Sequence, residues 1–276
     1  MNATRTLLCY LLFCSILLFT SVCGFSSVMV VGGLTYEHTA TPGEEYTGEI
    51  MLQNHSEEPK EVKVYQTDYF FYADQRVLYG DPGKLPRSNA SWITYTPKRL
   101  IVPPGETAKI FYTVQVPDLR NLKGSYWSVF MVEGIPEESP ESGTGSEPAD
   151  IGMGIQQVFR YAIQMITHIK ETGTKKIEFI GTRLLKVNDQ EQILELDVEN
   201  TGEVMVRATL WAELYNLEGE YVGKYEGGIL RIYPGTSVRF KVDLTSVPKS
   251  NYQALVVVDC GGESVFGANI NLVLKQ

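Results

Sequence analysis

The stretch LIVPPGETAKIFYTV, residues 100–114, returns later in the chain as LRIYPGTSVRFKVDL, residues 230–244. Each copy places a Pro-Gly turn before a run in which apolar and polar residues alternate. An alternation with a period of two puts successive side chains on opposite faces of a β-strand, so that one face can cover a core while the other meets water. Each stretch therefore predicts a turn followed by a strand with one buried face.

The repeat extends beyond these two stretches. An asparagine precedes each turn, Asn54 in the first half and Asn200 in the second, and each alternating run leads through a proline into an apolar run, 126–132 or 252–258. The first copy is longer, and its additional residues are expected around 72–90. Two copies of such a unit indicate two related domains rather than a solenoid.

The composition agrees with an all-β protein. Of the 276 residues, 43% are hydrophobic and 11% are aromatic, which is enough for two cores of ordinary domain size. Short apolar segments separated by Gly, Pro, Asn and Asp follow one another without a convincing amphipathic helix. We therefore predict two immunoglobulin-like β-sandwich domains in tandem. The inner-face candidates of the second domain are Leu194, Leu196, Val198, Leu210, Ala212 and Leu214.

The first 24 residues form a different kind of segment. Arg5 precedes the apolar stretch 7–19 and small residues follow it, which is the pattern of a secretory signal peptide. Cleavage before Phe25 is expected, with lipidation at Cys23 as the alternative. The apolar stretch is shorter than the ~20 residues of a spanning helix, so no stable membrane span is expected after cleavage. The expected location is the periplasm, the cell envelope or the medium.

The cysteine positions bear on disulfide formation, and the net charge bears on which partners the protein can bind. Three of the four cysteines lie in the leader, so Cys260 is the only cysteine of the mature chain and no internal disulfide is expected. Cys260 follows an apolar run and is interpreted as a small residue at a strand end. The formal net charge is −9 and no arginine-rich stretch occurs, so nucleic acid is not an expected partner.

We place the first domain at 25–170, a hinge at 171–176 and the second domain at 177–276. The segment 137–150 is rich in Glu, Ser, Pro, Gly and Thr and cannot bury a core. It precedes the long extended stretch 151–170, whose odd-numbered positions are apolar for almost its whole length. Because roughly eight or nine residues at ~3.3 Å each cross a sandwich, about half of this stretch should overhang.

Two strands of the first domain are also predicted. The first strand is expected over 28–34, and the alternating run after Thr107 is expected at the edge of its sheet.

An overhanging strand with an apolar face can complete the sheet of another protein. The candidate partner-binding side chains on this face are Ile151, Met153, Ile155 and Phe159. The alternative is that 151–155 pack within their own domain or against the second domain. The sequence leaves both interpretations open.

The leader, the two sandwiches, the block 92–133 with its Pro-Gly turn and the long final strand of the first domain resemble the PapD-like periplasmic pilus-assembly chaperones. The similarity covers most of the mature chain and is one of pattern rather than of a diagnostic motif. It implies a non-enzymatic protein that holds pilus subunits by lending a strand from its first domain. The matching donor positions are Ile155, Gln157 and Phe159, of which the polar Gln157 departs from the apolar pattern.

The resemblance also implies two basic residues in the cleft between the domains, which hold the terminal carboxylate of a subunit. No Lys or Arg occurs between Phe25 and Pro59, so the first-strand cation is absent, and the second position falls near the neutral Gln164. Arg160 lies on the same polar face and is the candidate cleft cation, with His168 and Lys170 as further candidates. The alternative for Arg160 is a solvated charge on the outer face.

No catalytic arrangement emerges from the sequence. The three histidines are far apart and show no metal-ligand spacing, so neither a metal nor another cofactor is expected. No nucleophile, base and orienting group can be assembled, which argues against an enzyme. The aromatic run 69–72 between Asp68 and Asp74 is a candidate glycan contact, although such residues more often pack on neighbouring strands.

The sequence therefore favours an exported, non-catalytic, PapD-like protein that assists folding or assembly of envelope or pilus-type subunits by β-strand addition. Its partner is expected to be another exported protein or a pilus-like subunit. A structural or adhesive component of a cell-surface assembly and a glycan-binding β-sandwich module remain as alternatives.

Overall fold

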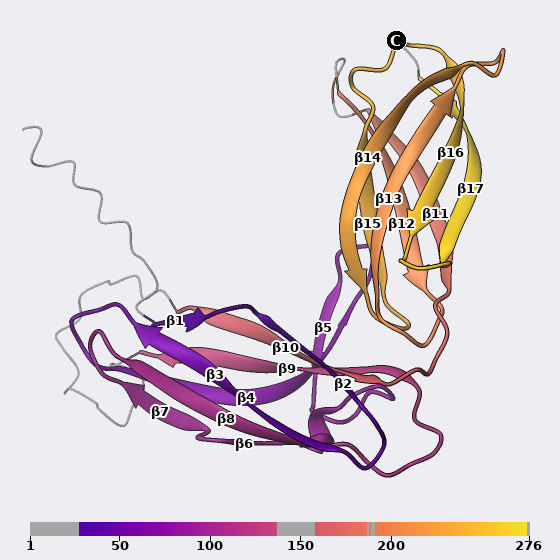
Figure 1. The fold of residues 1–276 in the computed structure, drawn as a ribbon. Helices are drawn as coiled ribbons and strands as arrows, with labels where there is room; N and C mark the ends of the chain where they lie inside the picture. The colour runs from indigo at the N-terminus through magenta and orange to yellow at the C-terminus, as the bar shows by residue number, and fades with distance from the viewer. Residues whose placement is uncertain (1–27, 137–157, 187, 189–190, 275–276) are drawn as a thin grey trace, which may run out of the picture.

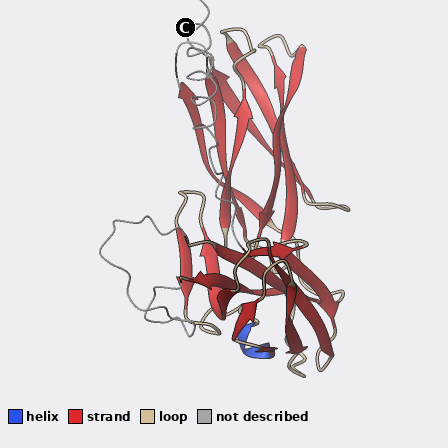
Figure 2. Cartoon of the chain, turned by 90° about the vertical axis from the view of Figure 1, so that its left-hand side faces the viewer, coloured by secondary structure: helices blue, strands red, loops and turns tan. Residues whose placement is uncertain are grey.

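The chain forms two β-sandwiches joined at a bend (Figure 1). The computed structural model describes residues 28–136, 158–186, 188 and 191–274. The predicted all-β fold with two immunoglobulin-like domains is confirmed, and a single short helical turn, η1 (Ala90–Trp92), interrupts the strands of the described residues (Figure 2). The leader and the candidates Ile151, Met153 and Ile155 lie outside the described residues.

In the described residues, the first sandwich contains ten strands in two sheets. The strands are β1 (Val28–Val31), β2 (Thr35–Ala40), β3 (Glu45–Asn54), β4 (Lys60–Phe71), β5 (Val77–Gly80), β6 (Ile93–Thr96), β7 (Arg99–Val102), β8 (Thr107–Gln115), β9 (Gly124–Ile135) and β10 (Arg160–Ile169). One sheet has the order β1-β3-β8-β6 and the other has the order β2-β10-β9-β4-β5, with β7 also paired to β4. Ile50, Ile110, Phe130 and Ile163 are fully buried between them.

Two predictions about the first sandwich were wrong. The expected first strand, 28–34, is split into β1 and β2, because the backbone at Gly32 takes a φ of +97°. Before this residue the chain pairs with β3 of one sheet, and after it the chain pairs with β10 of the other sheet. The strand after Thr107, β8, is not at an edge but lies between β3 and β6. Alternation reports which face of a strand is buried, and it carries no information on the strand's lateral neighbours.

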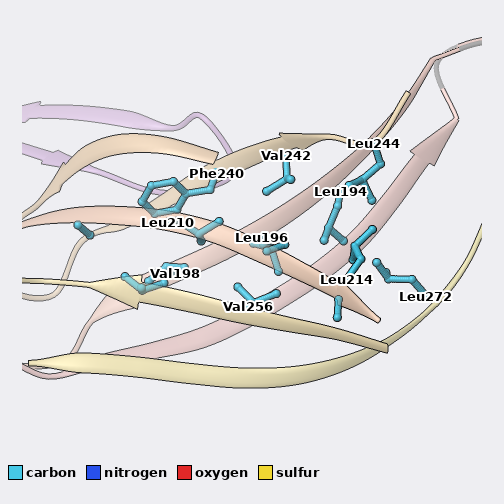
Figure 3. Close-up of a cluster of buried hydrophobic side chains, with 14 of the residues drawn as sticks. Leu194, Leu196, Val198, Leu210, Leu214, Phe240, Val242, Leu244, Val256 and Leu272 are labelled. Atoms are coloured by element: carbon cyan, nitrogen blue, oxygen red, sulfur yellow. The ribbon is translucent and has the colours of Figure 1, made fainter. Parts of the chain in front are cut away.

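The second sandwich contains seven strands. They are β11 (Ile177–Lys186), β12 (Gln192–Asn200), β13 (Val206–Tyr215), β14 (Tyr221–Ile232), β15 (Ser237–Asp243), β16 (Asn251–Asp259) and β17 (Val265–Val273). The sheet β11-β12-β15 packs on the sheet β14-β13-β16-β17. All six predicted inner-face residues are fully buried, and Figure 3 shows leucines of β12 and β13 pointing toward Phe240 and Val242 of β15. Cys260 follows β16 and is buried, and burial raises the pKa of its thiol to about 11.

The sequence repeat is a structural repeat. Asn54 ends β3, where its side-chain amide donates to the carbonyl of Val102 at 3.0 Å. Asn200 ends β12 and donates to the carbonyl of Ile232 at 2.9 Å. Each asparagine thus connects the end of its strand by a hydrogen bond to the residue that leads into the Pro-Gly turn. The glycines of the two turns have φ of +68° and +76°, a left-handed backbone that glycine adopts without steric cost.

The additional residues of the first copy form the β4–β5 hairpin and the loop that leads to η1. In Figure 1, β5 stands at the junction with the second sandwich. The backbone N–H of Ala73 in this hairpin donates to the Ser237 hydroxyl at 3.0 Å. The insertion therefore brings the first domain into contact with the second.

Candidate functional site

The first half of β10 has an open edge. On one side, β10 pairs with β9 along its whole length, from Arg160 opposite Glu133 to Ile169 opposite Gly124. On the other side, β2 joins only at Gln164 and runs parallel to it as far as Ile169. Among the described residues, no strand pairs with the β2 side of β10 before Gln164.

The direction of the backbone groups follows from two hydrogen bonds. The N–H of Gln164 donates to the carbonyl of Leu34 at 2.9 Å, on the β2 side. The carbonyl of Phe159 accepts from the N–H of Gly134 at 3.3 Å, on the β9 side. Because residues alternate along a strand, Arg160 and Ala162 direct their backbone groups toward the open edge. A partner strand would find unpaired donors and acceptors there.

Exposed apolar side chains flank this edge. Val158, just before β10, is 46% exposed, and Leu34, just before β2, is 44% exposed. Phe159 is half-buried, and the same odd-numbered face continues through Tyr161 to the buried Ile163. The structure therefore places the predicted Phe159 beside the open edge. Leu34 was not singled out from the sequence, because its role depends on where β2 begins to pair.

Arg160 lies at the start of β10, away from the second sandwich. Its Nε lies 2.7 Å from Glu133 Oε2, and its side chain is 53% exposed. The hydrogen bond to Glu133 raises the pKa of Arg160. The guanidinium is thus engaged by a carboxylate of its own sheet. The cations that reach the junction between the sandwiches are different residues, Arg207 of β13 and Arg231 of β14.

An apolar cluster joins the two sandwiches. Trp127 of β9, Ile166 of β10, Met205 and Tyr233 are buried together, with Tyr69, Phe70 and Phe71 packed against them. The rings of Trp127 and Tyr233 stack with centroids 4.7 Å apart. The Tyr233 hydroxyl donates to Gln164 Oε1, and burial raises the pKa of Tyr233.

A polar cluster borders these rings and centres on Glu37 of β2. Its Oε1 lies 2.6 Å from Arg207 Nη2 and 3.2 Å from Arg231 Nη2, so it pairs with two arginines of the second sandwich. Burial by itself raises the pKa of Glu37, but the hydrogen bond from Arg207 and the charges of both arginines outweigh it and lower the pKa. Arg231 Nη1 also donates to Gln164 Oε1 at 3.1 Å.

His168 of β10 extends this cluster toward the hinge. Its Nε2 lies 3.6 Å from Glu37 Oε2, and its Nδ1 lies 2.9 Å from the Ser125 hydroxyl. Burial lowers the pKa of His168, and the pull of Glu37 toward the charged form does not overcome it. The junction therefore combines an ionised carboxylate, two guanidinium groups and an imidazole held toward its neutral form.

The predicted hinge, 171–176, is braced by backbone contacts. The N–H of Ser125 donates to the carbonyl of Glu203 at 2.8 Å, and the N–H of Glu203 donates to Thr174 at 2.8 Å. The N–H of Met205 donates to the Ser125 hydroxyl at 2.8 Å. These bonds connect β9, the hinge and the loop before β13, so the connection is not a free linker.

The aromatic run 69–72 and the neighbouring Asp68 contact the junction and the loop beside it. Asp68 is buried, and its carboxylate accepts from the N–H groups of Lys84 and Leu85, each at 2.8 Å. Phe71 packs edge-on against Tyr233 with centroids 5.8 Å apart. Asp68 and Phe71 of the candidate glycan contact are therefore engaged by the protein itself.

Within the described part of the chain, no group of three or more His, Cys, Asp or Glu side chains is placed to hold a metal ion. In the same residues, no helix has the length and apolar character needed to cross a membrane.

No protein-family model matches the chain, and no curated protein matches it. Among solved structures, the chain is similar to the class 5 fimbriae chaperone CfaA, with 15% sequence identity, a TM-score of 0.47 and coverage of 89% of this chain and 99% of that one. It is also similar to the CsuC–CsuE chaperone–tip adhesion subunit complex of Acinetobacter baumannii Csu pili, with 12% identity, a TM-score of 0.47 and coverage of 89% and 98%. It is similar as well to the CupB2 chaperone of Pseudomonas aeruginosa, with 13% identity, a TM-score of 0.41 and coverage of 89% of this chain and 100% of that one.

Proposed function

We propose that this chain is an exported, non-catalytic protein that holds another exported protein by β-strand addition, in the manner of a PapD-like assembly chaperone. The observation that carries the proposal is the open edge of β10 between Arg160 and Ile163. Backbone hydrogen bonds along such an edge supply affinity, and pockets for alternate side chains supply specificity. The partner is a pilus-type or other envelope subunit that offers an apolar strand.

The surroundings of the edge support this function. Val158 and Leu34 expose apolar side chains next to the unpaired backbone. Natural proteins normally protect a free edge with charged residues, a proline or a covering segment. Arg160 is the charged side chain at this edge, and it is turned to Glu133 of β9. The leader pattern of residues 1–24 supports action in the periplasm or cell envelope.

A photo-crosslinking residue at Val158 tests the proposal in the tagged full-length chain, expressed in its own host. The expected result is capture of one small exported protein, identified by mass spectrometry. A crosslinker at Phe111, which is 53% exposed on β8 of the other sheet, is the matched control and should not capture it.

The variant Ala162→Pro makes the test specific for strand addition. Proline removes the N–H that faces the open edge and leaves the bonds to β9 in place, so the fold should persist while capture is lost. Leu34→Lys should also abolish capture, through a charge at the edge. Capture that survives both changes would contradict strand addition. Capture of the chain by itself would instead favour a structural component of an assembly.

A further inference from the structure

A second surface, on the outer face of β14-β13-β16-β17, carries cross-strand rows of aromatic, aliphatic and amide side chains. The even-numbered residues of β13 are buried in the core, so its odd-numbered residues lie on the outer face. Pairing across β13, β16 and β17 aligns three rows, which we call the aromatic–amide face: Tyr215, Gln253 and Asn271; Glu213, Leu255 and Asn269; Trp211, Val257 and Gly267.

The two aromatic side chains of this face are held in place by one carboxylate. Trp211 Nε1 donates to Glu213 Oε1 at 3.1 Å, and the Tyr215 hydroxyl donates to Glu213 Oε2 at 3.1 Å. Trp211 and Tyr215 lie four residues apart on one strand, which separates them by about 13 Å at ~3.3 Å per residue. The rings are therefore oriented before any ligand arrives, and the spacing exceeds the length of a single sugar ring.

Exposed amides lie beside the rings. Gln253, Asn269 and Asn271 are exposed, and within the described residues their side-chain amides make no hydrogen bond to the protein. Gly267 adds no side chain next to Val257, and the Leu255 side chain lies against this position. An amide offers two donors and an acceptor, which matches the hydroxyl groups of a sugar.

Charge on this face argues against an anionic ligand. Lys224 of β14 is the cation beside the rows; its Nζ lies 4.4 Å from the Trp211 ring centroid and 3.0 Å from Glu226. The outer face of the other sheet differs, because Arg183, Glu195, Asp197 and Arg239 form an ion-pair network there. Within the described residues, the three rows thus carry no cation of their own, and Lys224 beside them is paired with Glu226.

We propose that the aromatic–amide face binds a neutral, β-linked oligosaccharide. The Lys224 ammonium lies over the Trp211 ring and Tyr221 packs edge-on against Tyr215, so a sugar ring that stacks on Trp211 would displace the ammonium. The hydroxyls of the oligosaccharide would pair with Gln253, Asn269 and Asn271. A protein partner would have to desolvate these amides without pairing all of them, which is costly. This site lies on the second sandwich and is independent of the open edge of β10.

The indole N–H signals of the full-length mature protein provide the test. The chain contains three tryptophans, and Trp127 is buried in the junction while Trp92 packs on the first core, so Trp211 alone reports this face. Chitopentaose and cellopentaose serve as probes, and the comparison shows whether acetamido groups contribute. We expect a saturable shift of the Trp211 signal with at least one probe, with the Trp92 and Trp127 signals unchanged.

Two variants locate the site. Tyr215→Ala and Asn269→Ala should each weaken binding about tenfold or more, which corresponds to roughly 1.4 kcal/mol. Ile180→Ala, at a position 50% exposed on the other sheet, should leave it unchanged. Absence of a Trp211 shift with both probes, each at about 10 mM, would overturn the proposal, because this concentration detects even millimolar affinity. Wild-type affinity in both Tyr215→Ala and Asn269→Ala would overturn it as well.

Discussion

Asn200 shows how a single side chain fixes a turn in this fold. It is fully buried, and its amide donates to the carbonyls of Val204 and Ile232 at 2.8 and 2.9 Å. Its Oδ1 accepts from the N–H of Gly202 at 2.9 Å. Asn54 occupies the same place in the first sandwich. A buried backbone group that loses its partner costs about 1–3 kcal/mol, which explains why an asparagine stands at both positions.

Replacing Asn200 by alanine should therefore destabilise the second sandwich strongly. Three backbone groups lose their partner, and the carbonyl of Ile232 is a buried one, so we expect the free energy of unfolding to fall by roughly 2–4 kcal/mol. Urea unfolding followed by tryptophan fluorescence and circular dichroism measures the change. Asn251→Ala, at an exposed position at the start of β16, is the control and should shift stability by less than about 0.5 kcal/mol. A similar small shift for Asn200→Ala would refute the role assigned to its side chain.

At the scale of the element, the start of β9 determines how closely the first sandwich approaches the loop before β13. Gly124 has a φ of +69°, and a Cβ at this position would clash with the backbone of Glu203. Gly173 of the hinge also has a positive φ, +80°, and packs against Gly124. Side chains at these positions would force the backbones apart, so the hydrogen bond from Ser125 to Glu203 depends on them.

The variant Gly124→Ala should disturb the junction while leaving both cores intact. Strain at positive φ and the clash with Glu203 act together, and we expect a loss of about 2 kcal/mol or more. Amide hydrogen exchange should increase at Ser125 and Glu203. Gly134→Ala on the same strand is a matched control, because its φ is not in the positive range and a Cβ there meets no atom within 4 Å. Unchanged protection at Ser125 would show that the close approach is not required.

For the whole molecule, the arrangement of the two sandwiches rests on Glu37 and the arginines of the second domain. The carboxylate crosses the junction to Arg207 and Arg231, beside the stacked rings of Trp127 and Tyr233. Apolar stacking supplies buried area, whereas the ion pairs depend on direction and so oppose rotation of one domain on the other. Glu37 thus acts as an internal anion that pairs with Arg207 and Arg231 at the junction.

This arrangement should depend on pH. The pKa of Glu37 in the folded protein lies below its ordinary value of 4.5, so its contribution is fully present above that pH and is lost as the pH falls through the lower folded value. Residual dipolar couplings of the two sandwiches at pH 7 and below pH 4.5 measure their relative orientation. We expect the orientation of the wild-type protein to become less defined on acidification.

Glu37→Gln should show the low-pH behaviour already at pH 7. Glu49→Gln removes a carboxylate that pairs with Lys109 within the first sandwich and serves as the control. If Glu37→Gln keeps a defined orientation at pH 7, the ion pairs of Glu37 are not required to orient the domains.

Much of the fold was accessible from local patterns. Leu194, Leu196 and Val198 were assigned to an inner face from alternation alone, and all three are fully buried. Phe159 was identified by the same rule and lies beside the open edge of β10. The junction was not accessible in this way, because Glu37 on β2 and Arg231 on β14 are separated by most of the chain and meet only through the bend between the sandwiches.

What the sequence determined by itself is the set of strands, their buried faces and the duplication marked by Asn54 and Asn200, because these depend on side-chain period and local turn chemistry. What only the tertiary structure decided is the lateral order of strands, the split of the first strand at Gly32 and the length of β10 left unpaired by β2. Strand order and domain contacts arise from pairing between residues far apart in sequence. A periodic pattern describes one strand and contains no information about which strand lies beside it.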